Sequence, residues 1–317
     1  MHIRGNENIF LHRALTRRMD HLERYRSIIP DFDGFLSILA LPLPTTVRIN
    51  TLKTDRSRLL DRLDRADVAY TGLEWYPLGL RLGVERPGKM IEHVLGYIHI
   101  QEEVSMIPSI VLDPRPGDRV LDLCAAPGSK TTQISQATEN RGLVIANEPS
   151  LARITSLRSN CERLGAVNVA ITRYDGRRFP QQQFDRVLVD APCSSEGMAR
   201  KDPKVLGRCS LKRSLDLQVL QIGLLKRAVQ LTRSGGVIVY STCTYAPEEN
   251  EAVVDDVLGE YRDTVCLEKA SVKGLKGCPG LTEWNGTDFC DELKHCVRYY
   301  PHQNDTGGFF VARLVKK

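Results

Sequence analysis

The chain has 317 residues, of which 42% are hydrophobic and 26% are charged, and its formal net charge is +5. This composition excludes a disordered chain, and the length allows one large core with a smaller appended domain. No apolar run approaches the length of a membrane span, and the opening MHIRGNENIF lacks the apolar core of a signal peptide. We therefore expect a protein without a membrane anchor or a targeting segment.

Nine cysteines are scattered along the chain, an odd number that includes no C-x-x-C pair. This pattern argues against a disulfide framework and for a reducing, cytoplasmic location. Cys278, Cys290, His295 and Cys296 lie close in sequence, but their spacing matches no standard zinc pattern. We predict no metal site, and whether these four residues do more than pack stays open.

The first hundred residues mix helix and strand patterns. Residues 9–29 look helical and basic, residues 45–52 look like a strand, and residues 56–66 look like a second helix. We interpret residues 1–100 as a small α+β domain and residues 101–317 as a second, larger domain.

From Pro116 onward, short apolar runs alternate with helical stretches. The predicted strands cover residues 119–123, 142–148, 169–175, 184–192 and 235–242. The predicted helices cover residues 129–138, 151–164 and 215–231. This alternation predicts the α/β class, with a doubly wound, Rossmann-like parallel sheet. Two more strand-like runs, 296–302 and 307–316, flank turn residues and predict a closing antiparallel hairpin.

Four of the predicted strands have an acidic residue at or near their end: Asp122, Glu148, Asp175 and Asp190. Ligands bind beyond the carboxyl ends of parallel strands, although a single acid there is more often a helix cap or a turn residue. The loop CAAPGSKTT (124–132) has small residues that allow a ligand to approach closely, but it lacks the glycine spacing of a P-loop or a dinucleotide fingerprint. Glu148 suits a ribose and Asp175 an adenine, and without a phosphate cradle this combination points to S-adenosylmethionine.

Two cysteines follow strands that should be neighbours: Cys193 in VDAPCSSEG and Cys243 in VIVYSTCTY. A buried, inert thiol is the default for any single cysteine. Methylation of carbon 5 of a pyrimidine, however, requires a thiolate, because that carbon becomes nucleophilic only after a thiolate adds to carbon 6. Asp190, three residues before Cys193, is well placed to bond ring nitrogen 3. The spacing alone does not say which of the two thiols attacks.

The motifs VRINTLK, DLCAAPGSKTTQ, VDAPCSSEGMARKDP, STCTYAPEENE and YYPHQNDTGGFFVARL occur in this order, from about Thr46 to the C-terminus. Together they resemble the NOP2/Sun (RsmB/Trm4) family of RNA cytosine-5 methyltransferases, and the compact arrangement is most similar to the archaeal Trm4 type. The resemblance implies that Cys243 is the nucleophile, that Cys193 assists release of the methylated RNA, and that Lys130 lies near the reacting centre. It also implies an S-adenosylmethionine site made of Cys124, Ala125, Ala126, Pro127, Gly128, Ser129, Lys130, Glu148, Asp175 and Asp190.

Two residues depart from the family pattern. Ser195 stands where Gly or Ala is usual, which is expected to alter the loop after Cys193. Glu148 stands where Asp is usual, which keeps a carboxylate on a side chain one methylene longer.

The resemblance implies an RNA substrate, tRNA in preference to rRNA, and an RNA-recognition-like fold for the N-terminal domain. Nine Lys and Arg residues face three acids between residues 196 and 233, so this window carries +6 and predicts contacts with an RNA backbone. Taken alone, such a patch is more often an ordinary solvated face. We expect a monomer that does not act on DNA. The alternatives are a non-catalytic RNA-binding or ribosome-assembly factor, a DNA cytosine-5 methyltransferase and a small-molecule methyltransferase.

Overall fold

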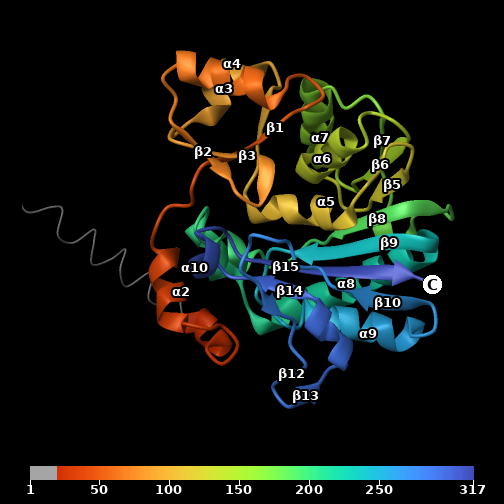
Figure 1. Cartoon of the computed structure of the whole chain (residues 1–317). Coiled ribbons are helices and arrows are strands. Elements are labelled where there is room, and N and C mark those ends of the chain that lie inside the picture. Colours follow the sequence, from red (N-terminus) through yellow and green to blue (C-terminus); the bar gives the residue numbers. More distant parts are fainter. Residues whose placement is uncertain (1–19) are drawn as a thin grey trace, which may run out of the picture.

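The computed structural model describes residues 20–317 (Figure 1). Of the helix predicted over residues 9–29, the part up to residue 19 lies outside the described residues. Its described part contains one short 3-10 helix, η1 (Asp20–Tyr25), and Pro30 disfavours helical backbone at the residue before it. The helix α2 (Phe32–Leu39), which was not predicted, follows this break and is capped by the side chain of Asp31.

A small antiparallel sheet comes next, with the strand order β2-β3-β1-β4. Its strands are β1 (Thr46–Ile49), β2 (Tyr70–Leu73), β3 (Tyr76–Leu82) and β4 (Ile98–Ile100), with the helices α3 (Arg56–Arg65) and α4 (Ile91–Val94) between them. Leu59 and Leu63, one helical turn apart on α3, are buried against Val47 and Ile49 of β1. The predicted strand 45–52 and helix 56–66 are thus confirmed, and the other three strands were missed.

The large sheet has nine strands, and its path runs β11-β14-β15-β9-β8-β5-β6-β7, with β10 paired to β15. Parallel pairing joins β9 (Thr232–Thr242), β8 (Phe184–Asp190), β5 (Arg119–Asp122), β6 (Leu143–Asn147) and β7 (Val169–Thr172). Antiparallel pairing adds β15 (Phe309–Lys316), β14 (Val297–Tyr299), β11 (Cys278–Pro279) and β10 (Val265–Glu268). The doubly wound α/β class and the closing hairpin are confirmed.

Helices cover both faces of the large sheet (Figure 1). Successive side chains of a buried strand alternate between these two faces. Leu121 and Val187 pack in one hydrophobic cluster with α8 (Leu211–Leu231) and α9 (Glu251–Tyr261). Val120 and Leu188 point to the other face, where they join α5 (Ile107–Leu112) and α6 (Ser129–Ala137). The helix α7 (Leu151–Leu164) covers β6 and β7. This packing leaves the carboxyl ends of the parallel strands at one edge.

Several predicted boundaries were wrong by three residues or more, and two of them have a clear local cause. The helix predicted from residue 215 begins at Leu211, because the Ser210 side chain accepts a hydrogen bond from Arg213 N at 3.2 Å and caps it. The third parallel strand ends at Thr172 rather than at Asp175, which instead caps a 3-10 turn.

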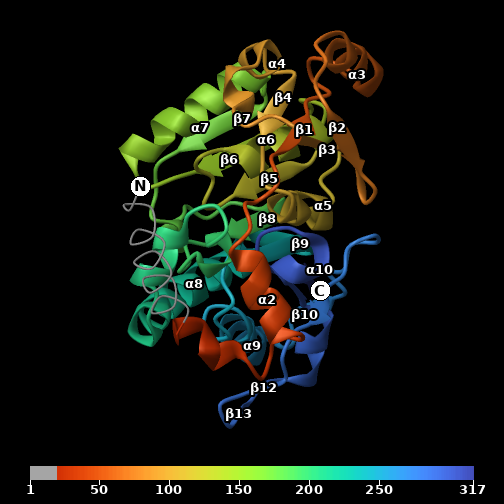
Figure 2. The same cartoon turned by 90° about the vertical axis from the view of Figure 1, so that its left-hand side faces the viewer.

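The first described segment packs on the large domain rather than on the small sheet. Leu22 and Tyr25 of η1 and Phe35 of α2 are buried in one cluster with Tyr245 and Tyr300. Figure 2 shows α2 crossing in front of the large domain near α10 (Pro301–Asn304). The division of the chain at residue 100 stays a prediction. Among residues 20–317, no helix is both long and apolar enough to cross a membrane.

Candidate active site

The two cysteines of the VDAPC and STC motifs meet at the carboxyl edge of the sheet. Cys243 directly follows β9, and Cys193 lies three residues beyond the end of the neighbouring strand β8. Their Sγ atoms are 3.3 Å apart, and both are free thiols. The neighbouring strands therefore place both thiols at one point, as the sequence predicted.

The contact between these thiols makes them ionise unequally. A hydrogen bond from Cys193 is the largest influence on Cys243 and lowers its pKa, although burial opposes this shift. The same bond and burial raise the pKa of Cys193 well above its ordinary value. Because the thiolate is the reactive form of cysteine, Cys243 is the better nucleophile of the pair and Cys193 its hydrogen-bond donor.

Asp190, the last residue of β8, is held by two neighbours. Its Oδ2 accepts a hydrogen bond from Lys130 Nζ at 2.7 Å, and its Oδ1 accepts one from Ser241 Oγ at 2.8 Å. Burial alone would lower the pKa of Lys130, but the charge and hydrogen bond of Asp190 outweigh burial and raise it. Lys130 is therefore a fixed positive charge beside the two thiols.

The predicted cofactor loop lines a pocket of about 270 Å³ together with Cys243. Of the predicted site residues, those in the pocket wall are Cys124, Ala125, Ala126, Pro127, Ser129, Lys130 and Asp190. Gly128 lies behind this wall with φ of 103°, and a Cβ there would contact Leu157 Cδ1 at 3.0 Å, so only glycine fits. The loop therefore packs tightly on α7 and presents its small residues to the pocket.

Asp122, which the sequence marked as a strand end but not as a cofactor ligand, also lines this pocket. Its Oδ2 accepts a hydrogen bond from Thr131 Oγ1 at 2.7 Å, while its Oδ1 is buried without a partner in the described part of the chain. Burial raises the pKa of Asp122 to about 7. A buried oxygen without a partner, on a residue that lines a pocket, is a ready acceptor for a bound ligand.

Two predicted cofactor ligands stand apart from the pocket wall. Glu148 is buried behind β6, where it accepts a hydrogen bond from Ser150 N at 2.9 Å and pairs with Arg153 at 3.1 Å. Asp175 is partly exposed and pairs with Arg177 at 2.6 Å, which holds its pKa below the ordinary value. Their cofactor roles stay predictions.

Some residues that line the pocket could not be identified from the pattern of strand ends. Ser105, Met198, Lys201 and Phe309 line it from three separate segments. Phe309 opens β15, and Lys130 Nζ lies 5.4 Å from the centroid of its ring. Among these, Phe309 lay within a quoted motif, GGFFVARL, and Met198 and Lys201 lay within VDAPCSSEGMARKDP. Only the folded chain brings them together.

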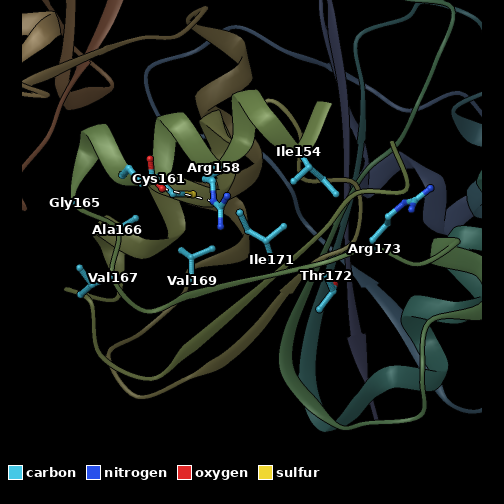
Figure 3. Close-up of a pocket in the computed structure, with 11 residues that line it drawn as sticks. Ile154, Arg158, Cys161, Gly165, Ala166, Val167, Val169, Ile171, Thr172 and Arg173 are labelled. Carbon is cyan, nitrogen blue, oxygen red and sulfur yellow. Dashed lines mark ion pairs between the residues drawn. The ribbon is translucent and has the colours of Figure 1, made fainter. Parts of the chain in front are cut away.

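A larger pocket, of about 590 Å³, lies between α7 and the edge strand β7 (Figure 3). Its wall includes Ile154, Cys161, Val169 and Ile171, and none of the predicted catalytic residues. Elsewhere in residues 20–317, no group of three or more His, Cys, Asp or Glu side chains is arranged to hold a metal. Cys278, from the C-terminal set, instead contacts the side chain of Gln303.

These features together indicate a methyltransferase that acts through cysteine. They are the doubly wound sheet, the small-residue loop after one strand, the strand-end carboxylates and the two thiols in contact. Comparison with known proteins gives the family. Residues 109–315 match the family described as 16S rRNA methyltransferase RsmB/F. The chain belongs to this family: it is an S-adenosylmethionine-dependent RNA cytosine-5 methyltransferase of the NOP2/Sun type, as its motifs predicted.

Three similar proteins illustrate the relationship. A tRNA (cytosine(49)-C(5))-methyltransferase of Pyrococcus abyssi is 39% identical over 302 residues, which cover 93% of this chain and 95% of the relative. Ribosomal RNA small subunit methyltransferase F of Erwinia tasmaniensis is 37% identical over 310 residues, which cover 93% of this chain and 62% of the relative. The crystal structure of a methyltransferase homolog from Pyrococcus horikoshii has a TM-score of 0.83 and 31% identity, and the match covers 96% of this chain and 99% of that one.

Proposed function

We propose that this enzyme methylates carbon 5 of a cytosine in tRNA, with Cys243 as the nucleophile. The observation that carries the assignment of the nucleophile is the contact between the two thiols, which lowers the pKa of Cys243 at the wall of the cofactor pocket. The choice of tRNA is supported by the archaeal relative, which is a tRNA methyltransferase of nearly the same length. An rRNA substrate is the second candidate, because the bacterial relative acts on rRNA, although this chain covers only 62% of it.

The pocket residues fit S-adenosylmethionine, which supplies an electrophilic methyl group when bound. The residues proposed to hold it are the loop 124–130 with Glu148, Asp175 and Asp190, to which we add Asp122. The partnerless oxygen of Asp122 and the glycine-dependent loop support this fit. Burial of an unpaired polar oxygen is costly, so a ligand that donates to it gains binding energy.

In the first step, the Cys243 thiolate forms a bond to carbon 6 of the ring, and the electron pair displaced from the C5=C6 bond makes carbon 5 nucleophilic. Asp190 faces the nitrogen 3 edge of the cytosine, where its carboxylate accepts a hydrogen bond from the exocyclic amine of the base. The charge of Lys130, held 2.7 Å from Asp190, offsets the electron density that the addition places on the ring. The ring must be unstacked from its neighbours so that the thiolate can reach its face.

In the second step, carbon 5 would already carry the methyl group that S-adenosylmethionine supplies, with the sulfonium carbon–sulfur bond broken. Carbon 5 then loses its proton to a base, the C5=C6 double bond re-forms, and Cys243 departs as a thiolate. Cys193 is placed to donate its S–H hydrogen bond to this departing sulfur, from 3.3 Å. A thiolate that is stabilised in this way is a better leaving group. This gives each of the two thiols its own role, one in attack and one in release.

Fewer cations of the basic window are free to contact RNA than the sequence predicted. Four of its nine cations bond to other parts of the chain: Arg200 to Asp305, Lys226 to Asp256, Arg227 to Phe179 O and Arg233 to Asp185. The other five are exposed and form no ion pair within residues 20–317: Lys201, Lys204, Arg208, Lys212 and Arg213. We propose that these five contact RNA phosphates. A monomeric state, a cytoplasmic location and the exclusion of DNA stay predictions.

The test incubates the enzyme with S-adenosylmethionine and separate pools of unmodified tRNA and rRNA, and then measures 5-methylcytidine by mass spectrometry. We expect the product in tRNA from the wild type and none from Cys243→Ala. We expect Cys193→Ala to form an RNA adduct that persists on a denaturing gel, because attack proceeds and release does not. Product formation by Cys243→Ala at the wild-type rate would refute the nucleophile, and product in rRNA alone would refute the substrate.

A further inference from the structure

A buried carboxylate lies between the two cysteine loops. Glu196, three residues after Cys193, has no solvent exposure. Its partners are His21 Nε2 at 2.7 Å, Tyr25 OH at 3.0 Å, Thr244 Oγ1 at 2.9 Å and Tyr245 N at 3.1 Å. A carboxylate that accepts this many hydrogen bonds fixes the groups that donate them.

These bonds connect the loop of Cys193 to the loop of Cys243. Thr244, the residue after Cys243, donates from Oγ1 to Glu196, and the same oxygen lies 2.6 Å from Ser194 Oγ. In addition, Gly197 N donates to the carbonyl oxygen of Cys243 at 2.9 Å. Three residues that follow Cys193, namely Ser194, Glu196 and Gly197, are thus bonded to residues on the other loop.

The two cysteines depend on this connection to different degrees. Cys243 directly follows β9, and Asn250 bonds the residues on both sides of it, through Thr242 Oγ1 at 2.6 Å and Thr244 O at 3.0 Å. Cys193 lies three residues past the end of β8, and Ser195, two residues further on, has left-handed backbone with φ of 65°. Its neighbours are also held, since Pro192 O accepts from Gln221 at 2.8 Å and Ser194 N donates to Glu249 at 2.9 Å, but Cys193 lacks the direct attachment to a strand that Cys243 has. Loss of the cross-link would therefore displace Cys193 more than Cys243.

We propose that Glu196, acting through the Thr244 hydroxyl, is a positioning residue that holds Cys193 against Cys243 and so sets the rate at which the RNA adduct is released. This inference rests on the proposed roles of the two thiols. His21 and Tyr25 of η1 also bond the Glu196 carboxylate, so η1 helps to hold it in place. A purely structural role would lower stability and slow attack and release together, whereas a positioning role slows release more than attack.

The experiment compares Thr244→Val, which removes the shared hydroxyl, with Thr244→Ser, which keeps it. The matched control is Thr155→Val, at an exposed position on α7. Each variant is mixed in excess with labelled tRNA and S-adenosylmethionine, and the methyl-transfer rate and the fraction of RNA bound covalently are followed over time. Thermal melts identify variants that fail to fold.

We expect Thr244→Val to transfer methyl within a few-fold of the wild-type rate and to release the adduct about tenfold more slowly or worse, so that a covalent band accumulates. Thr244→Ser and Thr155→Val should release as the wild type does. Glu196→Gln, which replaces an acceptor oxygen with a donor, should behave as Thr244→Val does.

Two results separate this inference from the proposed function. If Cys193→Ala traps the adduct but folded Thr244→Val releases it at the wild-type rate, Glu196 is not a positioning residue and the roles of the thiols stand. If Cys193→Ala traps no adduct, the role of Cys193 in release is wrong. Equal slowing of attack and release in Thr244→Val would also overturn the inference.

Discussion

Asp122 makes the stability of this enzyme depend on pH in a way that one substitution should remove. Burial raises its pKa to about 7 in the folded chain, against 3.8 as the ordinary value. The folded state therefore holds a proton that the unfolded state releases, so the contribution of Asp122 to stability is fully present below pH 3.8 and is lost as pH rises to about 7.

The size of the effect follows from the shift. Between pH 5 and the folded pKa of about 7 lie two pKa units, and each unit corresponds to about 1.4 kcal/mol. The unfolding free energy of the wild type should therefore fall by roughly 3 kcal/mol between pH 5 and pH 8 because of Asp122. Asp122→Asn has no titrating group at this position, so its unfolding free energy should not show this loss.

Urea unfolding at pH 5 and pH 8 measures this difference directly. Asp216→Asn, at an exposed position on α8, is the matched control and should follow the wild type at both pH values. The reasoning fails if the stability gap between Asp122→Asn and the wild type is the same at both pH values. It also fails if the gap changes in the opposite direction, because the wild type would then gain stability as Asp122 ionises.

Three further changes test the packing and the RNA surface. Gly197→Ala would place a Cβ against the carbonyl oxygen of Gly308, so the loop after Cys193 must shift, and we expect methyl transfer to fall by about tenfold or more in a tRNA assay. Arg298→Met leaves the fully buried carboxylate of Glu251 without its partner and should lower the unfolding free energy by about 3–5 kcal/mol in urea. Lys212→Gln combined with Arg213→Gln should lower the slope of log affinity for tRNA against log salt by about 1.5 to 2, with methyl transfer at saturating tRNA unchanged.

Two of these changes have a control elsewhere in the chain. Gly259→Ala adds a Cβ into open space on α9 and should stabilise the protein by about 0.5–1 kcal/mol, so a loss of activity there as large as in Gly197→Ala would undercut the steric argument. Lys269→Gln removes an exposed charge outside the window and should leave the salt slope as it is. Wild-type stability in Arg298→Met would mean that Glu251 finds another partner or takes up a proton.

Strand patterns and strand ends carried most of what the sequence could predict. Asp190 and Cys243 were placed correctly because both stand at the carboxyl ends of apolar runs, and parallel neighbours bring such ends together. The short strands β2 and β3 were missed because glycine and proline interrupt their apolar pattern. The charge of the basic window was correct as a sum, but Arg200 is buried against Asp305, a partner more than a hundred residues away that no local pattern indicates.

The partners that decide the chemistry are likewise distant in sequence. Glu196 was counted as an acid that offset a basic window, whereas it is buried between two active-site loops and η1. The ionisation order of Cys193 and Cys243 depends on a 3.3 Å contact across fifty residues of chain. Sequence spacing left the choice of nucleophile open. It shows which strands are followed by thiols, but not which thiol donates a hydrogen bond to the other.

The charges around the cofactor pocket favour the methyl donor over its product. The pocket wall contains three carboxyl groups, Glu102, Asp122 and Asp190, and two amines, Lys130 and Lys201. S-adenosylmethionine has a positive sulfonium that disappears when the methyl group leaves, so an ionised carboxylate near it would bind the donor more tightly than the product. The sulfonium would also favour ionisation of Asp122, whose pKa of about 7 in the free enzyme is set mainly by burial.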